Sequence, residues 1–183
     1  MTDKKATRVG FGEAILQLGK ENKNIVVLSA DLTSSVMATE FKNAFPERFI
    51  SVGIAEQDMV GISAGLSLTG KIPIMSTFSM FASGRCWDQI RNTVCYSNLN
   101  VKIGASHSGI TVGEDGATHQ ALEDICIMRC LPNMSVIVPC DAEETRKATI
   151  AAVKKDGPVY IRFGRSNVPP LSDENTPFVL RKA

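Results

Sequence analysis

Short apolar runs alternate regularly with helical patterns along most of this chain, and this alternation limits the folds that it can adopt. The runs are rich in valine, isoleucine and phenylalanine, which is typical of strands buried on both faces of a sheet. They span Ile25 to Ser29, Arg48 to Val52, Ile72 to Ser76, Val101 to Ala105, Ser135 to Val138 and Val159 to Phe163. The helical patterns cover residues 9–21, 36–45, 56–69, 79–97, 120–130 and 142–155.

Strands and helices that alternate in this way form a parallel sheet with right-handed crossovers and helices on both faces. The sequence therefore predicts a doubly wound α/β fold, a three-layer α/β/α sandwich around a six-stranded, mainly parallel sheet. The 183 residues suffice for one domain with a sizeable core, which we expect to cover residues 1–165. Residues 166–183 contain three prolines and are predicted to form an extended linker toward an absent C-terminal domain.

Composition and charge argue against several classes of function. The formal net charge is +1, so we expect no nucleic-acid partner and no membrane-surface partner. No apolar signal segment and no apolar run long enough to cross a bilayer occur in the sequence, which predicts a cytoplasmic protein. Five cysteines without a CxxC pair, together with only two histidines, predict reduced thiols and no metal site.

Candidate functional residues follow the predicted strands at their carboxyl ends. In a parallel α/β sheet these ends meet at one edge, where ligands bind. The residues that follow the six runs include Asp31, Thr33, Ser35, Glu56, Gln57, Thr77, Phe78, His107, Asp141 and Arg165. We therefore expect an active site at this edge of the sheet.

Glu56 lies between a predicted strand and a predicted helix, in the segment GIAEQ at residues 53–57. A purely structural role is open to it, because an acid at a helix N-terminus gains roughly 0.3–1 kcal/mol from the helix dipole. Burial in a closed cleft can instead raise a carboxyl pKa by up to ~3–5 pH units, at roughly 1.4 kcal/mol per unit. A buried Glu56 would then be able to share a proton, as a general acid or base does.

A glycine-rich loop, residues 107–120, carries both histidines of the chain, His107 and His119, together with Asp115. Its glycines allow sharp turns, but its residue order is not that of a nucleotide phosphate loop. Phe78 and Phe81 lie three residues apart near the start of a predicted helix. They would either pack in the core or form an apolar platform for a flat heterocycle.

These segments, in this order, closely resemble the pyrimidine-binding domain of transketolases. The resemblance rests on SADLT (29–33), GIAEQ (53–57), STFSMF (76–81), the loop 107–120, LPNM (131–134), PCD (139–141), DGPVYIR (156–162) and GR (164–165). It covers nearly the whole chain and is strongest to the C-terminal subunit of split, two-chain transketolases. In that family the domain has a doubly wound α/β fold and binds the aminopyrimidine end of thiamine diphosphate.

The resemblance implies a cofactor-binding set that consists of Asp31, Leu32, Glu56, Phe78 and Phe81. Glu56 matches the glutamate that hydrogen-bonds a pyrimidine ring nitrogen. This contact promotes the imino tautomer, whose nitrogen removes the thiazolium proton. Phe78 and Phe81 match aromatics that pack on the pyrimidine, and Asp31 and Leu32 match residues that line its pocket.

Further residues match substrate-binding positions in the family. The implied set comprises the sugar-hydroxyl and carbonyl contacts His107, Asp115 and His119 and the phosphate contacts Arg8, Ser35 and Arg165. Each charged contact to phosphate would contribute roughly 1.5–3 kcal/mol. Glu56, His107 and His119 form the implied catalytic set.

Two features depart from full-length members of the family. Gly84 stands where a further aromatic residue often packs on the pyrimidine. The Gly-Asp-Gly segment followed by Asn, with which the family binds diphosphate and Mg²⁺, does not occur in this sequence. The resemblance therefore implies that an N-terminal transketolase subunit carries that site, and that ketol transfer between sugar phosphates requires a homodimer or heterotetramer with it.

Three alternatives stay open. Deoxyxylulose-phosphate synthases share the GIAEQ and DGxTHQ segments, but they generally have aspartate in place of His107. The β subunits of 2-oxoacid dehydrogenases have the same domain but match the loop 107–120 poorly. A non-catalytic, dimerising paralogue is the third alternative, although it would have no need of Glu56 together with both histidines.

Overall fold

Six parallel strands in the order β3-β2-β4-β5-β7-β6 form the centre of the chain in a computed structural model that describes residues 4–180. The strands are β2 (Ile25–Ser29), β3 (Phe49–Ser51), β4 (Ile72–Phe78), β5 (Lys102–Ser106), β6 (Ser135–Ile137) and β7 (Val159–Arg162). Each lies on its predicted run. β4 continues to Phe78 rather than ending at Ser76, because it stays paired with β5 as far as Ser106. The predicted parallel α/β sheet is confirmed.

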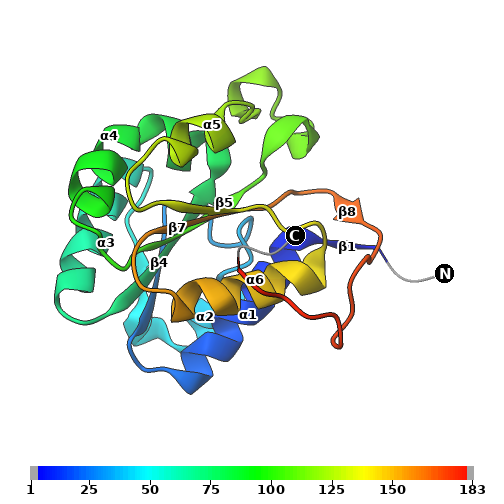
Figure 1. Cartoon of the computed structure of the whole chain (residues 1–183), viewed down its shortest axis with the longest axis horizontal. Helices are drawn as coiled ribbons and strands as arrows, with labels where there is room; N and C mark the ends of the chain where they lie inside the picture. The colour runs from blue at the N-terminus through cyan, green and yellow to red at the C-terminus, as the bar shows by residue number, and fades with distance from the viewer. Residues whose placement is uncertain (1–3, 181–183) are drawn as a thin grey trace.

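Helices cover both faces of this sheet, which confirms the three-layer sandwich (Figure 1). One face packs against α1 (Thr7–Glu21), α2 (Thr39–Ala44) and α6 (Ala142–Lys154). The other packs against α3 (Glu56–Leu68), the helical segment at 81–95 and α5 (Asp124–Arg129). Since most strands contribute side chains to both cores, their runs are apolar at nearly every position.

The helix predicted over residues 79–97 is interrupted in the structure. It consists of two π-helical turns, η2 (Phe81–Arg85) and η3 (Ile90–Cys95), joined by the short helix α4 (Trp87–Gln89). Its fully buried residues Ala82, Cys86, Ile90 and Val94 recur every four positions. A straight α-helix repeats every 3.6 residues, so wider turns keep this four-residue spacing on one face.

Strand order creates a crevice at the carboxyl edge of the sheet. From β2 the chain crosses to β3 on one side, and from β3 it returns to β4 on the other side of β2. Chain connections therefore leave in opposite directions from β2 and β4, and in such sheets ligands bind at this switch point.

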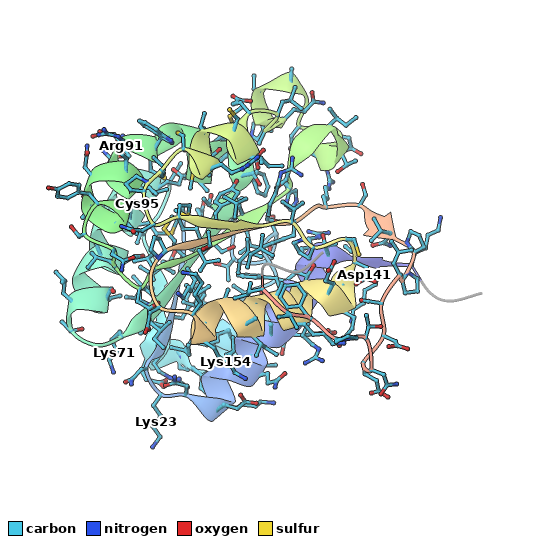
Figure 2. All side chains as sticks on the ribbon, in the orientation of Figure 1. Lys23, Lys71, Arg91, Cys95, Asp141 and Lys154 are labelled. Atoms are coloured by element: carbon cyan, nitrogen blue, oxygen red, sulfur yellow. The ribbon has the colours of Figure 1, made fainter. Side chains whose placement is uncertain are left out.

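The tail, predicted as an extended linker from residue 166, is held against the domain. A second, two-stranded sheet pairs β8 (Asn167–Val168) with β1 (Lys5–Ala6), as Figure 1 shows. Beyond it, the Asp141 carboxylate accepts hydrogen bonds from the backbone N–H groups of Leu171 (2.7 Å) and Ser172 (2.5 Å). Figure 2 shows Asp141 at the start of α6, beside this tail. A further domain beyond the tail stays a prediction.

Across residues 4–180, none of the helices combines the length and the apolar character that a membrane span requires. The same residues hold no group of three or more His, Cys, Asp or Glu side chains placed to bind a metal ion.

Candidate active site

A cavity of about 230 Å³ opens at the switch point between β2 and β4. Its lining includes Asp31, Leu32, Ile54, Glu56, Phe81 and Arg85. A larger cavity of about 1010 Å³ runs along β6 and residues 178–180, but none of the predicted site residues lines it. The smaller cavity is therefore the candidate site, because it brings together the polar and aromatic side chains expected at this edge.

Glu56 is buried at the base of this cavity, with 1% of its surface exposed. Gly53, at φ 69°, turns the chain from β3 toward α3, and Glu56 is the first residue of that helix. Its Oε2 accepts a hydrogen bond of 2.6 Å from Arg85 Nη1, and its Oε1 accepts a longer one of 3.4 Å from Thr77 Oγ1. The carboxyl group is thus both buried and paired with a guanidinium.

Arg85 was missed by sequence reasoning, which left Glu56 without a partner. The guanidinium carbon of Arg85 lies 4.1 Å from the centre of the Phe81 ring. In the sequence, Arg85 is one of many polar positions within a predicted helix, and no motif marks it. The π turn that places its side chain back over Phe81 became visible only in the structure.

Phe78, Phe81, His107 and His119 form one aromatic cluster. The strand register sets Phe78 opposite Ser106, so the next residue, His107, stacks on the Phe78 ring with centroids 4.1 Å apart. The two phenylalanine rings lie 6.0 Å apart and nearly parallel, and the His119 ring meets Phe81 edge-on at 5.2 Å. The structure thus brings together aromatic residues that the sequence placed on separate segments.

His107 is held in a buried, neutral state. It is 3% exposed, and it adopts a left-handed backbone conformation with φ 58°. Its Nδ1 lies 2.7 Å from Ser106 Oγ. Burial lowers the pKa of His107 to about 4, and the charges of Arg8 and Arg165 act in the same direction while Asp115 opposes them. The imidazole is therefore uncharged near neutral pH.

Arg8 and Arg165 line a separate, open pocket of about 360 Å³ beside the loop 107–120. Arg8 Nη1 donates to the backbone oxygen of Ser35 at 3.0 Å, and Arg165 Nη1 lies 3.9 Å from Asp115 Oδ2. Burial, followed by the charge of Arg165, lowers the pKa of Arg8. Two cations that line the same pocket favour an anion between them.

Not every predicted residue presents its side chain to these pockets. Ser35 meets Arg8 through its backbone oxygen, and it does not line the pocket that Arg8 and Arg165 share. Asp31 and Leu32 do line the cavity with Glu56, and Asp31 has a left-handed φ of 57°. Such backbone conformations in residues other than glycine are uncommon and often occur at functional sites. The functional roles of all these residues stay predictions.

Comparison with known proteins identifies a family. The family described as transketolase, pyrimidine binding domain, matches residues 3–170. A putative transketolase C-terminal section from Methanocaldococcus jannaschii is 55% identical over 161 residues, which cover 88% of this chain and 51% of that protein. The chain thus spans about half the length of this relative.

Two further proteins bear on the function. A solved structure described as a split gene transketolase, inactive beta4 tetramer, superimposes with a TM-score of 0.87 at 51% identity, covering 97% of this chain and 57% of that one. A 1-deoxy-D-xylulose-5-phosphate synthase from Desulfotalea psychrophila is 41% identical over 155 residues, or 85% of this chain and 24% of that protein.

Proposed function

The chain belongs to the transketolase pyrimidine-binding domain family, and from this membership we propose that it is the pyrimidine-binding, acid–base module of a thiamine-diphosphate-dependent transketolase. Together with a partner chain, it transfers a two-carbon ketol unit between phosphorylated sugars. The observation that carries this proposal is the buried Glu56 carboxyl group, which lines a cavity at the switch point beside the Phe81 ring.

The cavity is suited to one end of the cofactor. Its volume of about 230 Å³ is below the roughly 300–1,000 Å³ typical of sites for drug-sized ligands, so it fits a single ring rather than the whole molecule. Phe81 offers an aromatic face to a flat heterocycle in the cavity, whereas Phe78 does not line the cavity and packs against Phe81 and His107. Glu56 offers a carboxyl group that, when protonated, donates a hydrogen bond to a pyrimidine ring nitrogen.

Acid–base chemistry in this module falls to Glu56 and the two histidines. When bound, thiamine diphosphate supplies a thiazolium carbon that acts as the nucleophile toward a ketose carbonyl. Glu56 holds and releases a proton at the pyrimidine ring nitrogen, in a site from which burial excludes water. His107 is neutral and is tied to Ser106 through Nδ1, so its Nε2 is left to hydrogen-bond a sugar oxygen. His119, edge-on to Phe81, provides a second such group.

The pocket lined by Arg8 and Arg165 supports a sugar phosphate as the substrate. His107 is linked to both subsites, because its ring stacks on Phe78 and because, after burial, the charges of Arg8 and Arg165 contribute to its lowered pKa. A substrate that places its carbonyl near His107 can therefore place a terminal phosphate near the two arginines. Each charge-assisted contact of this kind contributes roughly 1.5–3 kcal/mol.

An N-terminal transketolase subunit is the proposed partner, and it carries the diphosphate and Mg²⁺ site. Mg²⁺ requires oxygen ligands in near-octahedral geometry, and we assign these ligands to the partner. The relatives described as a C-terminal section and as a split gene transketolase support a two-chain enzyme. The active assembly is then a homodimer of such pairs or a heterotetramer.

The proposal is tested by ketol transfer in the reconstituted two-chain enzyme. We expect transfer only when both chains are present, and we expect Glu56→Ala to lower the rate by about 10²–10⁴-fold, the range for loss of an acid–base group. Glu47→Ala is the matched control, because the Glu47 side chain is 69% exposed and, among the described residues, forms an ion pair with Arg48 alone. Thiazolium-proton exchange that is as fast in Glu56→Ala as in the unaltered enzyme would rule out the acid–base role.

A deoxyxylulose-phosphate synthase activity is the second candidate, favoured by the 41% identity to the Desulfotalea protein. His107 argues for transketolase, because the synthases generally have aspartate at that place. The same reconstituted enzyme, supplied with pyruvate and an aldose phosphate, separates the two activities. Product formed from pyruvate, but not from a ketose phosphate, would replace the first proposal with the second.

A further inference from the structure

Arg85 lines the cavity that is proposed to hold the pyrimidine ring, beside Glu56 and Phe81. Its guanidinium carbon lies 4.1 Å from the centre of the Phe81 ring, and its Nη1 donates to Glu56 Oε2 at 2.6 Å. This flat, nitrogen-rich group thus contacts the same two residues, Phe81 by stacking and Glu56 by a hydrogen bond, as those proposed for the aminopyrimidine. A ring that stacks on this face of Phe81 and hydrogen-bonds this carboxyl oxygen has to displace the guanidinium.

We propose that Arg85 is a latch, which competes with the aminopyrimidine of the cofactor for Glu56 and Phe81 and leaves the cavity when the cofactor binds. The inference rests on the proposed function, since it assigns the cavity to the pyrimidine. It adds a residue that controls access to the site and that the family resemblance did not mark.

The surroundings of Arg85 allow its side chain to leave. The side chain is 42% exposed, whereas Glu56 is 1% exposed. The residue before it, Gly84, has open space around it, since a Cβ there would meet only Met80 Sδ at 3.6 Å. The guanidinium can thus move away from Glu56 into water, and this movement does not disrupt a packed core.

The backbone of Arg85, by contrast, is fixed. Its carbonyl oxygen accepts a hydrogen bond of 3.1 Å from Gln57 Nε2, which ties the π turn η2 to the start of α3. The latch therefore moves by side-chain rotation, while Glu56 and Phe81 keep their positions for the incoming ring.

A second buried ion pair shows how a structural arginine differs. Arg162 Nε donates to Asp124 Oδ2 at 2.8 Å, and the same oxygen accepts from Tyr160 at 3.0 Å. Arg162 also donates to the backbone oxygen of Ala121 at 3.3 Å, and its side chain is 20% exposed. Within residues 4–180, Arg85 has a single side-chain hydrogen bond, to Glu56, so it is held far less firmly.

If the latch is closed in most molecules, the apparent affinity for the pyrimidine equals the intrinsic affinity multiplied by the fraction of molecules in which the latch is open. If about one molecule in ten is open, removal of the latch tightens binding about tenfold. The direction separates this inference from a supporting role for Arg85, since loss of a residue that positions Glu56 would weaken binding instead.

The test is a titration of the full chain with a probe that has only the pyrimidine end of the cofactor, 4-amino-5-hydroxymethyl-2-methylpyrimidine, followed by calorimetry and by NMR. We expect Arg85→Ala to bind it about tenfold more tightly than the unaltered chain. Arg91→Ala is the matched control, because Arg91 is exposed on the outer surface and contacts a different ring, Trp87, at 5.9 Å (Figure 2). Its affinity should be unchanged.

Guanidinium chloride at millimolar concentration provides an independent readout. We expect it to weaken binding of the probe to Arg85→Ala and to leave binding to the unaltered chain unchanged, because it refills the vacated position only in the variant. Equal or weaker binding of the probe to Arg85→Ala would overturn the latch and leave the proposed function in place. Failure of the probe to bind Arg85→Ala would also overturn the latch, while the ketol-transfer assay of the two-chain enzyme would still decide the proposed function. Equal affinity for the probe in Arg85→Ala and in the double variant Arg85→Ala/Phe81→Ala would overturn the latch and the assignment of the pyrimidine to this cavity.

Discussion

Replacing His107 with asparagine should reduce the loss of stability that the chain undergoes as the pH falls below neutrality. The imidazole is 3% exposed and stacks on Phe78; burial first, and then the charges of Arg8 and Arg165, lower its pKa from 6.5 to about 4. The unfolded chain therefore binds a proton at this residue at a higher pH than the folded chain does. Stability is complete above about pH 6.5 and falls as the pH decreases toward about 4.

The size of this effect follows from the two pKa values of His107. One pH unit of difference corresponds to roughly 1.4 kcal/mol, so the full difference is about 3 kcal/mol. Of this, about 2 kcal/mol is lost between about pH 7 and about pH 5, because at the lower pH the unfolded imidazole is mostly charged while the folded one is mostly neutral. Asparagine tolerates the left-handed backbone at this position (φ 58°) and does not titrate.

Urea unfolding of the chain at these two pH values measures the effect. The unaltered chain should lose about 2 kcal/mol more than His107→Asn between them. His119→Asn is the matched control, because His119 is only partly buried and its Nδ1 lies 2.9 Å from Thr118 Oγ1. An equal loss in the unaltered chain and in His107→Asn would show that the folded environment does not lower the pKa of His107.

Three further outcomes are expected. Lys102→Met should lower the free energy of unfolding, measured in urea, by about 2–4 kcal/mol. The buried Nζ donates to Asn100 Oδ1 (2.5 Å), Lys155 O (2.6 Å) and Gly157 O (2.7 Å), and these acceptors would lose their donor. An unchanged urea midpoint would show that water takes the place of the ammonium group. Arg165→Ala should raise KM about tenfold for phosphorylated sugars and hardly at all for unphosphorylated ones, and an equal change for both in steady-state kinetics would make Arg165 structural. In calorimetry, the chain alone should bind thiamine diphosphate and Mg²⁺ weakly or not at all. The diphosphate and metal sites are assigned to the partner, and association costs ~4–15 kcal/mol that the remaining contacts would have to offset. Magnesium-dependent micromolar binding would contradict that assignment.

Elements whose signals are local agree well between sequence and structure. β2 spans Ile25–Ser29 as predicted, and α3 and α6 begin at the predicted residues Glu56 and Ala142. Asp141 caps α6 by accepting a hydrogen bond of 2.8 Å from the backbone N–H of Glu144. Runs of apolar residues and helix caps depend on neighbours within a few positions, and a single sequence records these directly.

Elements that depend on distant contacts were not predicted. The pairing of β1 with β8 joins segments of two residues each from the two ends of the described chain, and so short a strand has no periodic pattern. The π turns of residues 81–95 were read as an ordinary helix, because the four-residue spacing of their buried positions differs little from 3.6 over a few turns.

The sequence by itself determined that this is a parallel α/β sheet and that Glu56, His107 and Arg165 follow its strands at one edge, because strand–helix alternation fixes which chain ends meet there. Only the tertiary structure decided what each side chain meets at that edge. The pairing of Arg85 with Glu56 joins residues 29 positions apart, and the stacking of His107 on Phe78 depends on the register between β4 and β5. Such contacts arise from the packing of whole elements against one another, and no local pattern in the chain specifies them.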